Sequence, residues 1–370
     1  MNANNVLGLI FSESYSSCIS ELTTLRTMAS VPFGGKYRFI DFTLSNMVNC
    51  GMTRVGIITK TNYQSLMDHV GNGKSWDLSR KNEGLFFLPP FNHGSGIYTG
   101  KIDALSSAMN FITMSDKDYV VLSDSNFICN IDLGDVIEKH IQSGADITVT
   151  AASGAIPRLR DIMLFDIAAD GRIRDIAIPA APEGEGVYST NIIVIGRTLL
   201  ERLVNEAVSY NYISLEHDIL QKNVDSLYIQ AYVINDFIAV IDSMPSYLEA
   251  NLSLLDPDCR DSLFVRSRPV YTKIADDMPA LYGIGSVVKN SIITDGSKIY
   301  GEVENSILFR DVQVAKGARV KNSIIMHHCV IGEDAVLENV IIDKDCVIRN
   351  GKKLCGASSY PVYVGKGIII

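Results

Sequence analysis

The stretch from residue 288 to residue 342 repeats one phrase four times: Val288-Lys-Asn-Ser-Ile-Ile293, Val303-Glu-Asn-Ser-Ile-Leu308, Val320-Lys-Asn-Ser-Ile-Ile325 and Leu337-Glu-Asn-Val-Ile-Ile342. The phrases begin 15, 17 and 17 residues apart, and turn residues such as Asp295-Gly296 and Lys316-Gly317 lie between them. A β-rich phrase at near-constant spacing is typical of a parallel β-helix, in which each coil buries its inner face by stacking on its neighbours. The repeats therefore predict a β-helix at the C-terminal end. A β-sandwich with coincidental similarity is the alternative.

Upstream of the repeats, short β-rich apolar runs alternate with helix-like stretches, which implies βαβ units and a largely parallel sheet. The ligand site of such a sheet lies outside the carboxyl ends of its strands. One helix is expected to begin at the N-cap Asp132, with Asp135 completing a capping box, and to end near Gly144. A second helix is expected over Pro245–Leu255. The expected strands are Val6–Phe11, Val55–Thr59, Tyr119–Leu122, Asp146–Thr150 and Asn191–Ile195.

Composition limits the classes of function. The 370 residues suggest two domains, and 47% hydrophobic residues supply a substantial core. The formal net charge of -9 argues against a nucleic acid partner, because phosphate backbones need a basic surface. No apolar run approaches a transmembrane helix, and the N-terminus has no signal-peptide pattern. The seven scattered cysteines form no C-x-x-C pair. We therefore expect a cytoplasmic protein with no membrane partner.

The run Val31-Pro-Phe-Gly-Gly-Lys-Tyr-Arg-Phe-Ile-Asp-Phe-Thr-Leu-Ser-Asn46 resembles the signature of ADP-glucose pyrophosphorylases (glucose-1-phosphate adenylyltransferases). Tyr98–Leu105 resembles that family's Gly-Thr-Ala-Asp-Ala motif, and the repeats resemble its C-terminal domain. The resemblance implies an α/β fold: a Rossmann-like, GT-A-like nucleotidyltransferase domain followed by a left-handed parallel β-helix. The expected boundaries are 1–255 for the first domain, 256–284 for a linker and 285–370 for the β-helix. Members of the family work as tetramers.

The loop after the first strand departs from the pattern of active members. They carry Gly-Gly-x-Gly-x-Arg there, so that backbone N–H groups approach the triphosphate of ATP. This chain reads Glu13-Ser14-Tyr15-Ser16-Ser17-Cys18, so Cys18 stands where the arginine belongs, and Glu13 adds a negative charge. Downstream, Met28 replaces the lysine of the family's Arg-Ala-Lys-Pro motif. The catalytic phosphate contacts are therefore predicted to be lost.

The metal site of the family is also altered. Ser125 stands where a metal-binding aspartate belongs, and Asp124 is one position off, which points it to the other side of an extended chain. Val240 replaces the second metal carboxylate. Ala177-Ile178-Pro179 replaces the Glu-Lys-Pro that meets the sugar phosphate. We expect no metal and no cofactor for this chain, with Mg²⁺ bound by a catalytic partner instead.

The resemblance therefore implies a non-catalytic, GlgD-type subunit that has no activity alone. It would pair with a catalytic homologue, in a hetero-oligomer expected to be a tetramer, for ADP-glucose and glycogen synthesis. Three alternatives remain. The first is an active glucose-1-phosphate adenylyltransferase with an atypical site. The second is a stand-alone sensor of a sugar nucleotide or effector. The third is an acyl-transferring β-helix enzyme, although His327 and His328 are expected to be coil-turn residues.

Two groups of residues are candidates for binding. Arg26, Lys36 and Arg38 lie in a region that contributes to effector binding in bacterial relatives, so they are candidate ligands of a phosphorylated metabolite. Ion pairs are the alternative role. Gly100 and Asp103 are candidates for a residual nucleotide pocket, with a structural hydrogen bond as the alternative for Asp103.

Overall fold

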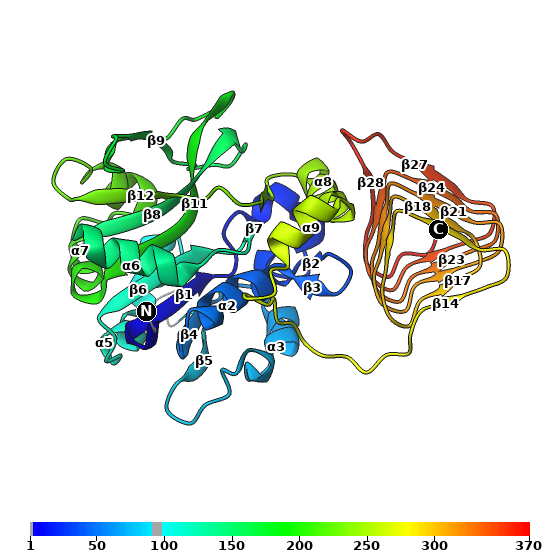
Figure 1. Ribbon diagram of the computed structural model, residues 1–370, viewed down its shortest axis with the longest axis horizontal. Coiled ribbons are helices and arrows are strands. Elements are labelled where there is room, and N and C mark those ends of the chain that lie inside the picture. The colour runs from blue at the N-terminus through cyan, green and yellow to red at the C-terminus, as the bar shows by residue number, and fades with distance from the viewer. Residues whose placement is uncertain (1–2, 91–97) are drawn as a thin grey trace.

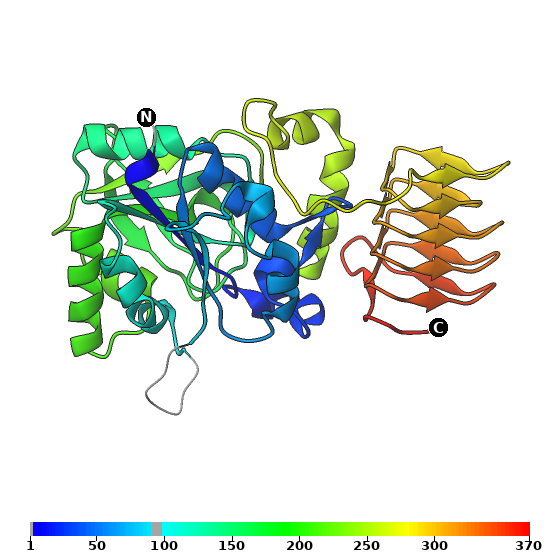
Figure 2. The same cartoon turned by 90° about the horizontal axis from the view of Figure 1, so that it is seen from below.

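The computed structural model describes residues 3–90 and 98–370, which form an α/β domain and a β-helix joined by an extended segment (Figure 1). The β-helix coils stack in register beside the first domain (Figure 2). This arrangement is the fold class that the sequence predicts, a nucleotidyltransferase-like domain followed by a left-handed parallel β-helix.

The first domain is built around one sheet in the order β10-β9-β11-β6-β1-β4-β5, with β8 paired to β11 and β12 paired to β8. The strand β1 runs parallel to β4 and β6, and β11 runs antiparallel to β6. All six residues of β1 are buried, as expected for a strand covered on both faces. The strands are β1 (Val6–Phe11), β4 (Arg54–Ile58), β5 (Gly84–Leu88), β6 (Tyr119–Asp124), β8 (Ile147–Ala155), β9 (Leu164–Ile167), β10 (Ile173–Ala177), β11 (Glu185–Gly196) and β12 (Ile229–Val233).

Helices cover both faces of the sheet and bury two separate cores. The helices α2, α3 and α6 pack on one face, and α4, α5 and α7 pack on the other. Two short sheets, β2–β3 and β7–β13, extend the domain toward the β-helix. The helices and short strands are α1 (Ser20–Thr23), β2 (Pro32–Phe33), β3 (Tyr37–Arg38), α2 (Phe39–Asn49), α3 (Gln64–Val70), α4 (Lys101–Ser107), α5 (Met109–Thr113), β7 (Phe127–Cys129), α6 (Leu133–Ser143), α7 (Arg197–Ser209), β13 (Ile238–Val240), α8 (Met244–Leu252) and α9 (Pro257–Leu263).

The helix expected to begin at Asp132 is α6. The Asp132 carboxylate accepts hydrogen bonds from the backbone N–H groups of Gly134 and Asp135, and Gly144 ends the helix in the left-handed conformation. The predicted capping box is wrong in its second half. The Asp135 side chain does not reach back; it accepts a hydrogen bond from Tyr232 Oη at 2.6 Å and pairs with Lys139. The Asp135 carboxylate thus bonds to Tyr232, from a distant segment, instead of to the backbone N–H of the N-cap residue.

The β-helix has three sheets of five parallel strands, one sheet on each side. The asparagine of every repeated phrase adopts a positive φ between 41° and 50°, a conformation that asparagine tolerates better than most residues. The serine that follows the asparagine in the first three phrases accepts a backbone N–H from the next coil. The repeated Asn-Ser is therefore the corner of each coil.

The sheets are β14-β17-β20-β23-β26, β15-β18-β21-β24-β27 and β16-β19-β22-β25-β28. Their strands are β14 (Leu281–Tyr282), β15 (Val287–Lys289), β16 (Ile292–Ile293), β17 (Lys298–Ile299), β18 (Glu302–Glu304), β19 (Ile307–Leu308), β20 (Gln313–Val314), β21 (Arg319–Lys321), β22 (Ile324–Ile325), β23 (Val330–Ile331), β24 (Val336–Glu338), β25 (Val340–Ile342), β26 (Val347–Ile348), β27 (Lys353–Cys355) and β28 (Val362–Val364).

A third core joins the two domains. Side chains of β19, β22 and β25 pack there against residues of α1, α2, α8 and β13. The predicted linker, 256–284, contains α9 at its start and β14 at its end, and α9 packs on the first domain through the buried Leu263. The glycines of the Phe33-Gly34-Gly35 run form the β2–β3 turn with positive φ, and a Cβ on Gly35 would clash with Thr294 of the β-helix. Close packing between the domains therefore requires this glycine.

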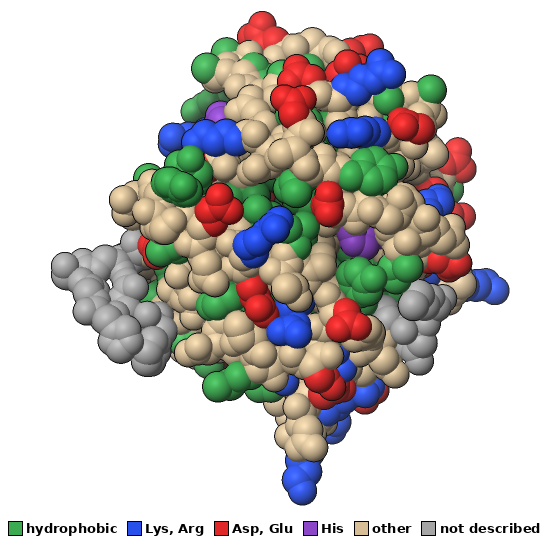
Figure 3. Space-filling view, turned by 90° about the vertical axis from the view of Figure 1, so that its left-hand side faces the viewer, with side chains coloured by type: hydrophobic (Ala, Val, Ile, Leu, Met, Phe, Trp, Pro, Cys, Tyr) green, Lys and Arg blue, Asp and Glu red, His purple; other side chains and the backbone are tan. Residues whose placement is uncertain are grey.

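On the first domain's face away from the β-helix, acidic and basic side chains are interspersed over the described surface (Figure 3). That mixture does not resemble the basic surface of a nucleic-acid-binding protein. Within residues 3–90 and 98–370, the helices are too short or too polar to cross a membrane.

Candidate functional site

A cavity of about 620 Å³ opens at the carboxyl ends of β1 and β4. This is the edge where parallel α/β sheets bind their ligands. The start of α4 and a π-helical segment, Leu215–Gln221, complete its wall. Aromatic rings and hydroxyl groups dominate the lining, with charged groups among them: Phe11, Ser12, Glu13, Ser14, Tyr15, Ser17, Thr59, Lys60, Tyr98, Thr99, Lys101, Arg160, Asp161, Ser214, Glu216, His217 and Asp218.

Side chains anchor the loop that follows β1. The Glu13 carboxylate accepts hydrogen bonds from the backbone N–H groups of Lys60, at 3.0 Å, and of Thr61. Burial raises the pKa of Glu13, although these bonds oppose the shift. Tyr15 adopts a positive φ of 60°, and its hydroxyl accepts a hydrogen bond from Asn191 Nδ2 at 2.8 Å. The Glu13 carboxylate thus accepts the hydrogen bonds of the backbone N–H groups at the edge of the cavity.

The other altered loop positions offer no cation to a phosphate. The carbonyl of Ser16 accepts a hydrogen bond from Thr23 Oγ1 at 2.7 Å. Cys18 is half-buried, and burial raises the pKa of its thiol, so the neutral form is favoured. Met28 is fully buried in the core that joins the domains. The predicted loss of cationic phosphate contacts is compatible with these positions.

A lysine and two carboxylates form a closed network on the cavity floor. The Lys101 Nζ atom lies 2.7 Å from Asp124 Oδ2 and 2.7 Å from Glu216 Oε1. Ser14 Oγ donates to the other Asp124 oxygen at 2.6 Å. Burial opposes the charge on Lys101, but the two carboxylates raise its pKa well above the ordinary value. Neither residue was predicted from the sequence. Lys101 lies within the Tyr98–Leu105 motif, and Glu216 lies in a segment without a motif.

The positions that would hold Mg²⁺ in active relatives do not fit a metal. Ser125 Oγ donates to the Phe11 carbonyl at 3.2 Å, and Val240 is a strand residue paired with Phe127. Asp124 already bonds Ser14 and Lys101. In the part of the chain that the structure describes, no three His, Cys, Asp or Glu side chains gather as metal ligands would. Asp124 does not itself line the cavity, but its carboxylate contacts the cavity-lining Lys101.

Gly100 and Asp103 have structural partners at the start of α4. A Cβ on Gly100 would clash with the carbonyl of Ile213, so the glycine permits close packing of that loop. The Asp103 carboxylate accepts a hydrogen bond from the backbone N–H of Thr99 at 3.2 Å. Gly100 lines the cavity and Asp103 does not. Their assignment to a residual nucleotide pocket stays a prediction.

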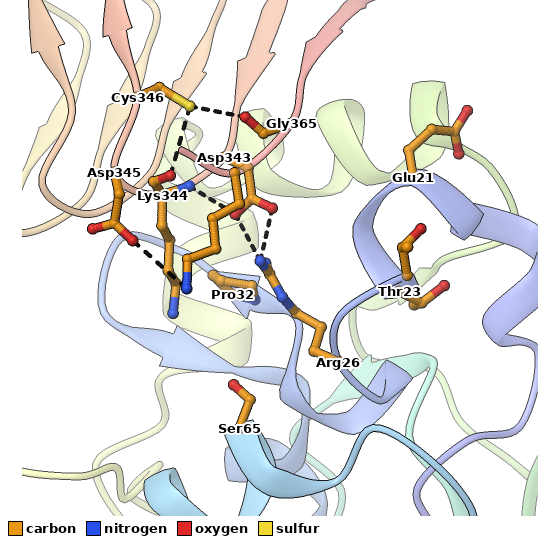
Figure 4. Close-up of polar contacts among 12 residues, drawn as sticks. Glu21, Thr23, Arg26, Pro32, Ser65, Asp343, Lys344, Asp345, Cys346 and Gly365 are labelled. Atoms are coloured by element: carbon orange, nitrogen blue, oxygen red, sulfur yellow. Dashed lines mark hydrogen bonds and ion pairs between the residues drawn. The ribbon is translucent and has the colours of Figure 1, made fainter. Parts of the chain in front are cut away.

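A second polar region lies between the domains. Arg26 Nη2 lies 2.9 and 2.7 Å from the two carboxylate oxygens of Asp343, and the two side chains are only 4% and 3% exposed. The Arg26 Nη1 atom is buried and has no hydrogen-bond partner among the described residues. Figure 4 shows Arg26 of the first domain reaching Asp343 of the β-helix, with Lys344 beside it. The ion pair connects residues 317 positions apart.

The other two predicted anion ligands differ in position. Arg38 Nη1 donates to the carbonyl of Ser65 at 2.6 Å and to its hydroxyl at 2.9 Å. Burial lowers the pKa of Arg38 to about 10, and the nearby charge of Arg26 adds to the shift. Lys36 is exposed, and its Nζ atom lies 5.2 Å from the centre of the Tyr37 ring. Arg26 and Arg38 thus lie in one electrostatic cluster.

The β-helix adds one titratable cation, Lys344, and one neutral imidazole, His327, to this cluster, and neither was predicted as a ligand from the sequence. Burial lowers the pKa of Lys344 to about 7, and the charges of Arg38 and Arg26 lower it further. Burial lowers the pKa of His327 to about 2, with a further contribution from Lys344, so the imidazole is neutral. The buried Nδ1 atom of His327 lacks a hydrogen-bond partner within the described chain. We name Arg26, Arg38, Lys344 and His327 the interdomain cationic cluster.

Two family models match separate parts of the chain. Residues 14–161 match a nucleotidyl transferase model. Residues 280–358 match the model of the GlmU-like C-terminal hexapeptide domain. The matches correspond to the α/β domain and to the β-helix.

Curated relatives match over most of the chain. A glycogen biosynthesis protein GlgD from Bacillus subtilis is 36% identical over 99% of this chain and 97% of its own. A GlgD protein from Geobacillus stearothermophilus is 38% identical over 86% of this chain and 83% of its own. A glucose-1-phosphate adenylyltransferase from Thermotoga maritima is 33% identical over 85% of this chain and 76% of its own.

Proposed function

The chain belongs to the GlgD family of glycogen biosynthesis proteins, and we propose that it is a non-catalytic subunit in glycogen biosynthesis. It pairs with a catalytic homologue that makes ADP-glucose from ATP and glucose 1-phosphate. The hetero-oligomer is a tetramer, and this chain supplies regulation and interface area. The observation that carries the proposal is the closed Lys101–Asp124–Glu216 network on the cavity floor.

The chemistry of adenylyl transfer explains why this network supports the proposal. Transfer from ATP needs a metal ion and cationic groups to hold the charge that develops on the phosphates. The ammonium of Lys101 is instead bound to two carboxylates. Ser125 and Val240 have no carboxylate that could bind a metal ion. Removing one preorganised donor typically slows a reaction by roughly 10²–10³-fold. Mg²⁺ therefore belongs to the catalytic partner in this proposal.

Purified alone, the chain is expected to form no ADP-glucose from ATP, glucose 1-phosphate and Mg²⁺, because Ser125 and Val240 supply no metal carboxylate and Lys101 is bound to two carboxylates. Mixed with the catalytic homologue of the same organism, it is expected to raise the activity or alter its response to effectors. The measurement is ADP-glucose formation at fixed catalytic subunit, with light scattering on the mixture to determine its mass.

The matched control is the catalytic homologue alone at the same concentration of catalytic subunit. Turnover by this chain alone, lost in an Asp124→Asn variant, would contradict the proposal and favour an active enzyme with an atypical site. Failure of the two proteins to associate, together with an unchanged rate on mixing, would remove the subunit role.

The interdomain cationic cluster is the proposed effector site. The buried Nη1 atom of Arg26 has no hydrogen-bond partner in the described part of the chain. The charges of Lys344, Arg26 and Arg38 act on one another, and the Asp343 carboxylate pairs with Arg26. A phosphorylated metabolite supplies the anionic oxygens that such a cluster pairs with. The pair between Arg26 and Asp343 couples this site to the contact between the domains.

Sulfate binding to the cluster is expected to weaken as the pH rises from 6 to 8. The pKa of Lys344 is lowered to about 7, so its ammonium is charged below that pH and neutral above it. Sulfate stays dianionic throughout, and His327 stays neutral because its pKa is about 2. Loss of one charge-assisted hydrogen bond corresponds to roughly tenfold in affinity. Calorimetry at both pH values measures the change.

The control for this titration is Lys344→Met. It is expected to bind sulfate weakly at both pH values, with the pH dependence lost. A dependence that survives in Lys344→Met would assign the titration to another group and contradict the role of Lys344.

The cavity also supports a second candidate, a stand-alone sensor of a sugar nucleotide. Its volume of about 620 Å³ and its lining of aromatic rings and hydroxyls suit a nucleoside or sugar. Tight binding of ADP-glucose to the isolated chain, without turnover and without a partner, would favour this function over the subunit.

A further inference from the structure

The Lys101 ammonium group occupies the place of a cation between two buried carboxylates. Its Nζ atom lies 2.7 Å from one oxygen of Asp124 and 2.7 Å from one oxygen of Glu216. The Asp124 side chain is fully buried, and that of Glu216 is 7% exposed. Two carboxylate oxygens therefore converge on one point inside the protein.

Each of the four carboxylate oxygens has a donor. Lys101 donates to Asp124 Oδ2 and Glu216 Oε1, Ser14 Oγ donates to Asp124 Oδ1 at 2.6 Å, and Ser214 Oγ donates to Glu216 Oε2 at 3.1 Å. Burying two such groups without a cation would be costly, because buried charges need compensation. The network is complete only while the ammonium is present.

Lys101 is held in this position by its surroundings. It is the first residue of α4, directly after Gly100, which packs against the carbonyl of Ile213. Its Nζ atom also lies 5.3 Å from the centre of the Phe11 ring and 5.8 Å from that of Tyr15. An incoming metal ion would have to displace an ammonium that already has two carboxylates and two rings around it.

We propose that Lys101 is a built-in cation that closes a latent divalent-cation site formed by Asp124 and Glu216. The ammonium excludes metal ions from the native cavity, and its removal opens the site. Ca²⁺ binds oxygen ligands at roughly 2.3–2.6 Å and Mg²⁺ at roughly 2.0–2.1 Å. The oxygens at 2.7 Å from Nζ need a smaller inward shift for a calcium-sized ion. Water completes the coordination from the cavity side.

The test is Lys101→Met in the full chain, which keeps an unbranched side chain and removes the charge. Calcium titration is followed by calorimetry and by the midpoint of thermal unfolding. The native chain is expected to show no calcium effect at this site. Lys101→Met is expected to unfold at a lower temperature without calcium, and to recover with calcium at a dissociation constant of roughly 0.1–1 mM.

The control is the double variant Lys101→Met/Asp124→Asn, which is expected to lose calcium binding and calcium recovery together. Magnesium at equal concentration is expected to recover less stability than calcium. The inference is overturned if Lys101→Met folds but ignores calcium, or if the native chain binds calcium as tightly and loses that binding in Asp124→Asn.

A folding failure is also informative. If Lys101→Met is insoluble with and without calcium while Lys101→Met/Glu216→Gln folds, the carboxylates cannot hold the ion and the inference is overturned. If Lys101→Met is recovered only in the presence of calcium, the inference is supported. These measurements involve neither ADP-glucose nor a partner subunit, so they stand or fall independently of the proposed function.

Discussion

Arg26→Met is expected to lower the free energy of unfolding by about 3–5 kcal/mol, the usual cost of removing one partner of a buried ion pair. The Asp343 side chain is 3% exposed and would be left in the protein interior without its guanidinium. Its remaining donors are the backbone N–H of Lys344, at 2.8 Å, and the Tyr363 hydroxyl, at 3.2 Å. The single proton of that hydroxyl is shared with the Glu21 carbonyl, at 2.9 Å. These neutral donors replace only part of a charge-assisted bond. Urea unfolding, followed by circular dichroism, measures the loss.

The matched control is Arg80→Met. Arg80 pairs with Asp77 at 2.6 Å, but its side chain is 41% exposed and that of Asp77 is 89% exposed. Exposed pairs of this kind contribute about 0–1 kcal/mol, so the control should unfold close to the unchanged chain. Equal effects of the two substitutions would mean that the interdomain pair gains nothing from burial. Because two domains need not unfold together, each transition is fitted separately.

The β-helix could be predicted from the sequence because its determinants are local. Each repeated phrase places an asparagine at a corner, with φ between 41° and 50°, and its first and last residues, such as Val303 and Leu308, inside the coil. Register follows directly from repeat spacing, since Val303 pairs with Val320 and Val320 with Leu337. A solenoid of this kind needs only neighbour contacts, and sequence similarity between neighbours reveals them.

The candidate site was only partly predictable, because its contacts join distant segments. The losses at Cys18, Ser125 and Val240 are visible from a family motif. The groups that fill the site are not visible from a motif. Lys101 bonds to Glu216, which lies 115 residues away in a segment without a motif. Tertiary structure also decides the partner of Arg26. From sequence it is one of three cations near an expected effector site; in the fold, a carboxylate 317 residues away pairs with it.

Phe309→Ala is expected to lower the free energy of unfolding by about 3–5 kcal/mol, the usual range for truncating a buried phenylalanine. The side chain is fully buried in the core that joins the domains, and its ring centre lies 5.1 Å from that of His327. The cavity left behind lies where the β-helix meets the first domain. The loss should therefore appear both as a lower unfolding midpoint and as weaker docking between the domains.

Two controls separate these effects. Tyr360→Ala removes an aromatic side chain that is 81% exposed, and it should change stability by less than about 0.5 kcal/mol. Val320→Ala truncates a residue of the β-helix's own core, so it should destabilise the coils without loosening the contact between domains. Small-angle scattering detects that contact as a change in the radius of gyration. If Phe309→Ala and Val320→Ala prove indistinguishable in both stability and size, the shared core adds nothing to docking. Polar contacts such as the Arg26–Asp343 pair and the hydrogen bond from Tyr363 Oη to the Glu21 carbonyl would then hold the domains together.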